Sequence, residues 1–202
     1  MASRPDVQRR HRERREQTRR KLLDAARELL EDRPWREITP EDLTTRAAIT
    51  RTAFYRHFGD QQLLLLALID DVGLRLDLVA DPWEQATDDP IASLSASLRE
   101  LVDVFHAHGR LIQALADAAT QDQEVAAVYA DLGARLSRSA ADRIAHEVAE
   151  GRSSVNDPEE VAAALVWMNE RYLLSRFGRQ PLADPERAAA ALAQVWHRTV
   201  YR

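Results

Sequence analysis

The sequence predicts an all-α protein with a small N-terminal helical domain and a larger C-terminal one. Glycine and proline are scarce, at 6 and 8 of 202 residues, whereas the strong helix formers alanine and leucine are abundant. Runs of β-branched residues, which favour strands, are nearly absent. Because hydrophobic residues make up 45% of the chain, we expect these helices to enclose a substantial core.

The composition also excludes several classes of protein. The chain has no cysteine, which rules out disulfides and thiolate metal sites and suits a reducing cytoplasm. Its beginning is too polar for a signal peptide. The longest apolar run, Leu63 to Ile69, spans seven residues and is too short to cross a bilayer. We therefore expect a cytoplasmic protein with no membrane partner.

Charge divides the chain into two parts. Residues 1–60 carry 15 Lys and Arg against 11 Asp and Glu, whereas residues 61–202 carry 13 against 22. Such an asymmetry is typical of a small DNA-binding domain attached to an acidic sensing domain. Residues 1–14 read either as a disordered basic arm or as an extension of the next helix. The arm could follow the DNA backbone or remain a solvated tail.

The first element in order is a helix from about Arg15 to Asp32. Its apolar stripe, at helical spacing, consists of Leu22, Ala25, Ala26, Leu29 and Leu30. Pro34 ends this helix, and we expect Trp35 and Ile38 to cover the bottom of the domain, which extends to residue 60.

Two short helices joined by a tight turn follow. Thr39 is a good N-cap, Pro40 suits the first helical position, and Asp42 stands where a capping-box acid belongs. This helix ends at about Ala48. Thr50 then caps a second helix that extends to Phe58.

The second of these helices has one apolar and one polar side. Phe54 and Phe58 are four residues apart and so share the face that packs inward. The other sides carry hydroxyl, guanidinium and imidazole groups, from Arg51, Thr52, Tyr55, Arg56 and His57. Such a helix can enter the major groove and contact phosphates and base edges. We interpret it as a DNA recognition helix.

The run from Thr50 to Phe58, followed by a leucine-rich helix, resembles the signature of TetR-family transcriptional regulators. The resemblance extends from about Leu22 to Leu66. It implies an N-terminal three-helix helix-turn-helix DNA-binding domain and a larger C-terminal helical domain for ligand binding and dimerisation. The equivalents of four residues contact phosphates in that family, namely Thr39, Thr50, Tyr55 and His57. Those of three others face bases, namely Arg51, Thr52 and Arg56.

Two departures from the family pattern fall beside this helix. Ala48 stands where the family usually has Gly, so its turn must tolerate a methyl group. Gln61 stands where the family usually has Lys, so one expected phosphate contact becomes a neutral hydrogen bond. The helix that Gln61 begins should run to about Val79 and link the two domains. The loop after it, from Asp81 through Pro82 to the acidic segment 87–90, contains Trp83, which could be a lid or simply packed.

The C-terminal domain, residues 61–202, should contain five further helices. One begins near Ile91, and His108 and Gly109 break it, so that a shorter helix runs to about Ala119. Three more are expected at 122–150, 158–177 and from Pro185 onward. The last two carry small residues and more apolar surface than one core needs, so we expect a homodimer built on them.

Aromatic residues and a lone amide, Asn169, indicate a mostly apolar ligand cavity in this domain. The segments Met168–Arg171, Ser175–Pro181 and Val195–Tyr201 resemble the EthR-type regulators of the TetR family, where equivalents of Asn169 and Trp196 line a hydrophobic channel. Leu94, Leu136 and Val166 replace more aromatic or polar residues of those proteins. The complete set of expected ligand contacts is Leu94, Leu101, Phe105, Tyr129, Leu136, Val166, Asn169, Tyr172 and Trp196.

Other chemistry has weaker support. His106 and His108 are not at metal-binding helical spacing, His146 lacks a second histidine in an HExxH pattern, and the serines have no glycine elbow. We therefore expect no metal, no cofactor and no enzyme. The expected function is a repressor that a small hydrophobic ligand releases from its double-stranded DNA operator. The alternative is a helical adaptor whose N-terminal helices bind a protein partner.

Overall fold

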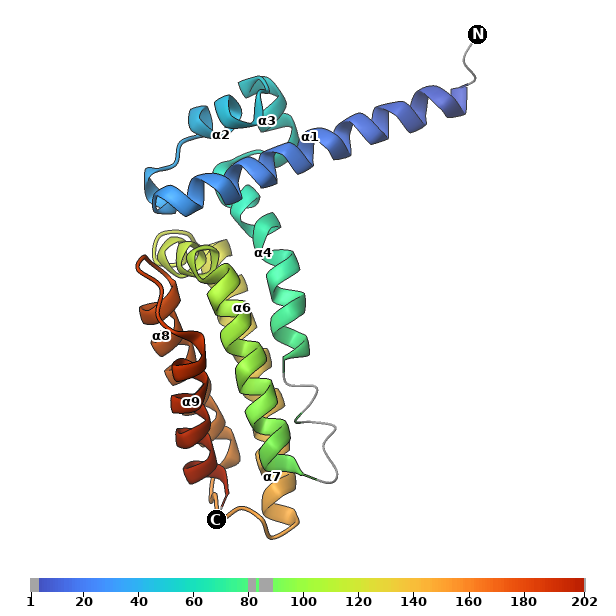
Figure 1. Ribbon diagram of the computed structural model, residues 1–202. Coiled ribbons are helices and arrows are strands. Elements are labelled where there is room, and N and C mark those ends of the chain that lie inside the picture. Colours follow the sequence, from blue (N-terminus) through green and yellow to red (C-terminus); the bar gives the residue numbers. More distant parts are fainter. Residues whose placement is uncertain (1–3, 80–82, 84–88, 202) are drawn as a thin grey trace. The chain divides into compact units, whose positions relative to one another are not determined.

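The computed structural model describes residues 4–79, 83 and 89–201, and every regular element in this part is helical, which confirms the all-α prediction (Figure 1). The helices are α1 (Arg4–Asp32), the short 3-10 helix η1 (Trp35–Glu37), α2 (Pro40–Ala47), α3 (Arg51–Phe58), α4 (Gln61–Leu78), α6 (Pro90–Ala118), α7 (Gln123–Ala149), α8 (Pro158–Phe177) and α9 (Pro185–Val200). None of the helices described combines the length and apolarity that a membrane span needs.

The chain divides into two compact units, Met1–Leu68 and Ile69–Arg202. This division falls eight residues after the boundary predicted at residue 60, because the first two turns of α4 belong to the first unit. Leu64, Leu65 and Leu68 in these turns are fully buried. The helix that links the two units therefore supplies core residues to the first of them.

In the first unit, α1 provides the apolar stripe on which α2 and α3 pack. All five predicted stripe residues are buried, as are Trp35 and Ile38 below them. The helix begins at Arg4 rather than near Arg15, so residues 4–14 continue α1. Of the two structures considered for this segment, the helical extension is the one found.

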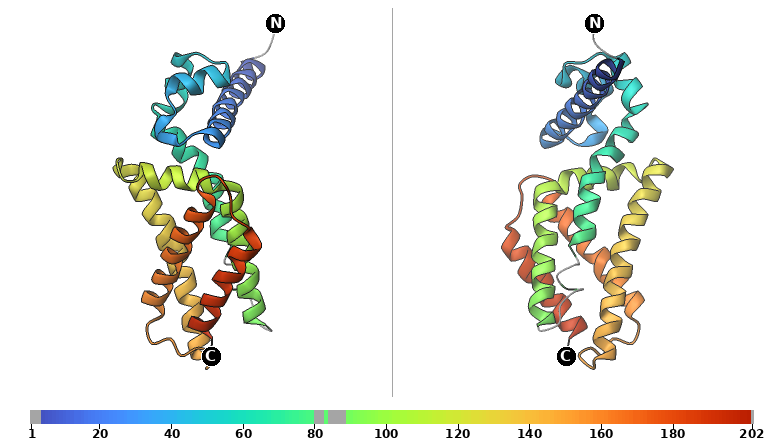
Figure 2. Two further views of the ribbon diagram at one scale, coloured as in Figure 1. Left: turned by 60° about the vertical axis from the view of Figure 1, so that its left-hand side comes forward. Right: turned by 90° about the vertical axis from the view of Figure 1, so that its right-hand side faces the viewer.

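In the second unit, α6 packs against α8 and α9, and α7 packs against α8 (Figure 2). The predicted break of α6 at His108 and Gly109 is wrong, because the helix is continuous from Pro90 to Ala118. Gly109 serves a close approach instead: a Cβ atom there would lie 2.5 Å from the carbonyl oxygen of Phe177. Only glycine lets the backbones of α6 and α8 come so near at this point.

A buried charge cluster lies in this unit between α7 and the segment after it. The carboxylate of Glu147, fully buried, lies 2.5 Å from Nη2 of Arg143 and 2.6 Å from Nε of Arg152. Burial raises the pKa of Glu147, but the hydrogen bond from Arg152 and the charge of Arg143 outweigh it, so that the pKa is lowered overall. The carboxylate therefore stays ionised between its two cations.

The indole of Trp83 joins this cluster to the aromatic interior. Trp83 is buried, and the guanidinium of Arg143 lies 5.9 Å from its ring centroid. Its Nε1 donates to the hydroxyl of Tyr201 at 2.8 Å, and its ring meets that of Trp196 edge to face at 5.7 Å. Of the two alternatives for Trp83, the structure therefore has it packed. Asp81, Pro82 and most of the acidic segment predicted around it lie outside the described residues.

Candidate functional site

The start of α2 is fixed by hydrogen bonds between side chains and the backbone. Thr39 and Asp42 form the predicted capping box: Asp42 N donates to Thr39 Oγ1 at 3.2 Å, and Thr39 N donates to Asp42 Oδ2 at 2.8 Å. Hydrogen bonds from Arg33 and Thr39 lower the pKa of Asp42 to about 2. The Thr39 hydroxyl also donates to Asp42 Oδ2, at 2.7 Å, so its proton is already in use.

Ala48 ends α2 in the left-handed conformation, with φ 53° and ψ 48°. The turn thus has the backbone that favours glycine, and the methyl group of Ala48 is accommodated at a conformational cost of about 1–2 kcal/mol. Thr50 then caps α3 through the amide of Ala53, at 3.2 Å, as predicted.

The structure brings the predicted base- and phosphate-contacting residues of α3 onto the solvent side of the helix. Arg51, Thr52 and Arg56 are exposed, and Tyr55 is 46% exposed. The opposite side is fixed in the core by Phe54 and Phe58, with ring centroids 6.4 Å apart. The two buried rings therefore fix the orientation of α3, and the four polar side chains on its opposite side are accessible to a binding partner.

His57 lies at the edge of this face and is half-buried. Burial lowers its pKa, and the positive charges of Arg56, Arg15 and Arg19 lower it further. The imidazole is therefore neutral at pH 7 in the free protein, and it can offer one N–H donor but no charge.

Gln61, the other predicted contact in this region, uses its amide inside the unit. Its Nε2 donates to the carbonyl oxygen of Ile38 at 2.7 Å and to that of Trp35 at 3.4 Å. A terminal amide has two N–H donors, so neither remains for an outside acceptor. The side chain ties α4 to the segment between α1 and α2.

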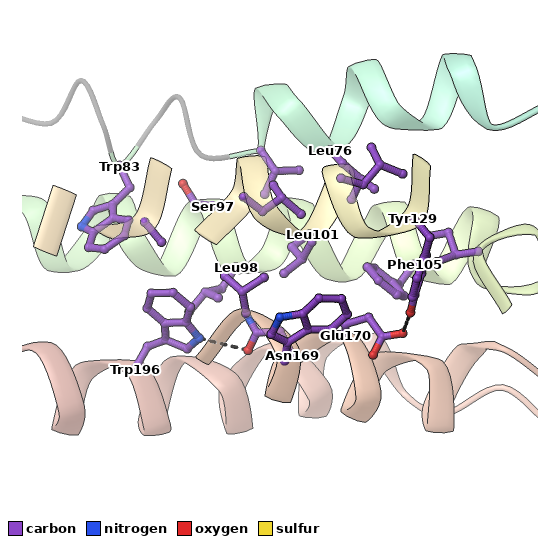
Figure 3. Close-up of a pocket in the computed structure, with 18 of the residues that line it drawn as sticks. Leu76, Trp83, Ser97, Leu98, Leu101, Phe105, Tyr129, Asn169, Glu170 and Trp196 are labelled. Atoms are coloured by element: carbon purple, nitrogen blue, oxygen red, sulfur yellow. Dashed lines mark hydrogen bonds between the residues drawn. The ribbon is translucent and has the colours of Figure 1, made fainter. Parts of the chain in front are cut away.

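A cavity of 110 Å³ lies in the second unit, among α4, α6, α7, α8 and α9 (Figure 3). Eight of the nine predicted ligand contacts line it, namely Leu94, Leu101, Phe105, Tyr129, Leu136, Val166, Asn169 and Trp196. The ninth, Tyr172, does not; its ring lies under the guanidinium of Arg176, at 5.7 Å, which leaves its predicted contact without support.

Other lining residues were not predicted, and most of them are aliphatic. They include Ile69, Leu76, Val79, Leu98, Ile112, Leu115 and Leu132. Their helical spacing is that of ordinary core residues, so the sequence offers no signal that separates the two roles. Gly133 is a different case: a Cβ atom there would lie 2.8 Å from the Trp167 ring, so glycine makes room for the indole.

Two hydrogen-bonded pairs supply polar groups to this apolar wall. Asn169, only 4% exposed, accepts a hydrogen bond at Oδ1 from Nε1 of Trp196, at 3.0 Å. Because indole can only donate, this bond orients the amide and leaves its NH₂ group as a donor. At another point the Tyr129 hydroxyl donates to the carboxylate of Glu170. Burial and this carboxylate together raise the pKa of Tyr129 well above its ordinary value.

Ser97 is the third polar group of the wall. Its hydroxyl is buried and has no hydrogen-bond partner among the described residues. A buried hydroxyl without a partner costs about 1–3 kcal/mol. Its signal in the sequence is a serine within the apolar stripe formed by Leu94, Leu98 and Leu101.

His106 and His146 have neighbours that do not suit a metal site. The ring of His106 meets Phe177 edge to face at 5.6 Å, and Glu147, beside His146, is held by two arginines. Within the described residues no group of three or more His, Asp or Glu side chains could hold a metal ion.

Comparison with known families gives two matches that together cover most of the chain. A profile described as "Transcriptional regulator EthR, C-terminal domain" matches residues 94–202, more than half of the chain. A profile described as "Bacterial regulatory proteins, tetR family" matches residues 22–68. The chain belongs to the TetR family of transcriptional regulators. As a member of this family it is a DNA-binding regulator and not an enzyme.

Relatives of similar sequence agree with this assignment, and a solved structure shares the fold. The EthR regulator of Mycobacterium tuberculosis is 29% identical over 184 residues, which cover 89% of this chain and 85% of the relative. EthR of Mycolicibacterium smegmatis is 27% identical over 183 residues, with coverages of 89% and 84%. The crystal structure of NalD, the secondary repressor of the MexAB-OprM multidrug efflux pump in Pseudomonas aeruginosa, has a TM-score of 0.74 at 22% identity and covers 94% of this chain and 98% of its own.

Proposed function

We propose that this TetR-family regulator is a ligand-responsive repressor, acting in the cytoplasm, that a small lipophilic molecule releases from its operator. DNA binding is supported by the polar face of α3, which is exposed while Phe54 and Phe58 on the opposite face are buried. Ligand binding is supported by the apolar cavity and the few polar groups in its wall. Such cavities are how proteins hold small molecules.

On the DNA side, α3 is the recognition helix. Arg51, Thr52 and Arg56 meet base edges in the major groove, while Tyr55 and His57 donate to phosphates. The cap hydroxyl of Thr50 adds a phosphate contact, and that of Thr39, whose proton already bonds Asp42, adds a weaker one. We leave Gln61 out of this set, because its donors bond backbone carbonyls and its remaining oxygen would repel a phosphate.

We further propose that the functional unit is a homodimer formed through α8 and α9. Large apolar side chains are exposed on these helices, with Trp167 at 42% and Val195 at 40%. Exposed apolar surface of this kind marks association sites. A two-fold dimer would present two α3 helices to successive major grooves, about 34–36 Å apart for half-sites one turn apart.

The ligand acts through α4 in this proposal. That helix begins at Gln61, which bonds the segment between α1 and α2, and it supplies Ile69 and Leu76 to the cavity wall. The cavity is smaller than the roughly 300–1,000 Å³ of drug-sized ligand sites, so a ligand is either small or enlarges it. To invert a 99:1 preference for the DNA-binding form, the ligand must favour the other form by about 5.5 kcal/mol.

The DNA half is tested by footprinting on the DNA that flanks the protein's own gene, followed by titration of the site found. Arg56→Ala should weaken binding by about 1–3 kcal/mol if the guanidinium reads a guanine. Arg187→Ala, an exposed arginine of α9, is the charge-matched control and should have little effect. Equal affinities for the two variants and the parent protein would show that another surface binds DNA.

The ligand half is tested by repeating the footprint in the presence of uncharged lipophilic molecules. Asn169→Leu should change the concentration of ligand that abolishes protection, while protection without ligand stays the same. Loss of both would assign Asn169 a structural role. Deleting residues 1–14 separately tests whether the N-terminal turns of α1 touch phosphates, in which case the slope of log K against log[salt] becomes shallower.

A further inference from the structure

Ser97 behaves differently from Ser95 and Ser137, two other serines on the helices that surround the cavity. Ser95, two residues before it, donates to the carbonyl oxygen of Ile91 at 3.0 Å, and Ser137 on α7 donates to that of Gly133 at 2.8 Å. A helical serine normally satisfies its hydroxyl in this way. The Ser97 hydroxyl makes no such bond to any described residue, although the side chain is only 5% exposed.

The surroundings of Ser97 on α6 offer no partner. Its neighbours in the cavity wall on this helix are Leu94, Leu98 and Leu101, which are apolar. A water molecule held in such a place would lack the two to four polar partners that buried waters have. Of the other polar groups of the wall, Tyr129 is bonded to Glu170, and Asn169 is bonded to Trp196 through its oxygen, so that only its NH₂ group is left as a donor.

Position along α6 separates Ser97 from the Tyr129–Glu170 pair. Figure 3 shows Ser97 towards the Trp83 end of the wall and Glu170 towards Phe105. Eight residues of helix from Ser97 to Phe105 correspond to a rise of about 12 Å. An occupant that reaches both ends is therefore elongated, with an apolar middle part against Leu98 and Leu101.

We infer that Ser97 is a hydrogen-bonding anchor of the ligand cavity, and that the natural ligand carries an uncharged oxygen group, a hydroxyl or a carbonyl, at the end that reaches it. An ionised group is excluded at this end because the lining residues around Ser97 provide no opposite charge to offset its desolvation. This inference rests on the proposed ligand-binding function and specifies the chemistry of its ligand.

The test compares two probes of nearly equal shape, 2-nonanone and 2-methyl-1-nonene, in which a CH₂ group replaces the carbonyl oxygen. Dissociation constants are measured by calorimetry for the parent protein, Ser97→Ala and the control Ser95→Ala, whose hydroxyl is already bonded and lies outside the cavity lining. The preference for the ketone should fall by about 2- to 12-fold in Ser97→Ala, the worth of one neutral hydrogen bond, and stay unchanged in Ser95→Ala. The same measurements with Asn169→Leu added to each variant exclude a hydrogen bond from the Asn169 amide to the ketone.

Thermal unfolding without any probe gives a second measurement, because the sign of the Tm change differs between a ligand anchor and a structural role for Ser97. Removing a buried hydroxyl that lacks a partner should raise the Tm of Ser97→Ala by about 2–4 °C, whereas removing a structural hydrogen bond would lower it. An unchanged ketone preference, or a lowered Tm, overturns the role of Ser97 but leaves the ligand cavity in place. Failure of the parent protein to bind either probe counts against the proposed lipophilic site itself, and the inference falls with it.

Discussion

The two units of this regulator are specified in different ways. In the first, the ends of α2 and α3 are set by bonds between residues three apart, such as Thr39 with Asp42 and Thr50 with Ala53. In the second, decisive contacts join residues far apart in sequence, such as Trp83 with Tyr201. The geometry of α2 and α3 is therefore encoded locally, whereas the cavity exists only once distant helices have packed.

The largest expected effect belongs to the second unit and its buried charges. Glu147→Gln removes the carboxylate but keeps the shape, so that the buried guanidinium of Arg143 loses the negative charge that lies 2.5 Å from it. We expect a loss of about 3–5 kcal/mol in the free energy of unfolding, measured in urea. Glu150→Gln is the matched control, because Glu150 is exposed and lies 3.5 Å from Arg152; it should change stability by less than about 1 kcal/mol. Similar losses of stability in both variants would show that the burial of Glu147 does not determine the size of the effect.

The next prediction concerns the close approach at Gly109. Gly109→Ala places a methyl group 2.5 Å from the Phe177 carbonyl oxygen, so α6 and α8 must separate, at a cost of about 1–3 kcal/mol. Gly73→Ala on α4 meets only Leu132, at an ordinary 3.4 Å, and should stabilise by up to about 1 kcal/mol through helix propensity. Opposite signs in thermal unfolding support the distinction, and stabilisation by both would show that the helices tolerate the added carbon.

A smaller effect tests the local encoding of the first unit at adjacent alanines. Ala48→Gly relieves the left-handed backbone and should stabilise the unit by up to about 1 kcal/mol, after the greater freedom of glycine in the unfolded chain is subtracted. Ala47→Gly, within α2, should destabilise it by about 1 kcal/mol. Hydrogen exchange of the amides in residues 4–68 measures both. If both variants exchanged faster, the turn would not be strained.

The smallest expected effect is a dependence on pH in the first unit. Because the folded-state pKa of Asp42 is about 2, below its ordinary value of 3.8, its contribution is complete above pH 3.8 and disappears as the pH falls through 2. Stability of residues 4–68 should therefore decline over this window. Asp42→Asn should flatten this part of the profile; an identical decline would assign it to other carboxylates.

Much of the fold could be predicted from the sequence because its signals are local. The caps Thr39 and Thr50 and the stripe of α1 have the predicted roles. Gly109 misled the prediction because a glycine that breaks a helix and one that admits a neighbouring backbone look alike until the neighbour is known. Four of the eight predicted residues that line the cavity are aromatic residues or the lone amide, and three aliphatic ones, Leu94, Leu136 and Val166, were placed by the resemblance to the EthR-type regulators. The other aliphatic lining residues could not be recognised, since lining and core positions share one helical spacing.

The tryptophans give this protein a built-in optical reporter. Of its four indoles, Trp83, Trp167 and Trp196 line the cavity, and Trp35 is buried in the first unit. A guest molecule entering the cavity changes the polarity and the quenching around three of the four fluorophores at once. Emission from the unlabelled protein should therefore reveal occupancy directly, and replacing Trp35 by phenylalanine would leave a signal that comes from the cavity alone.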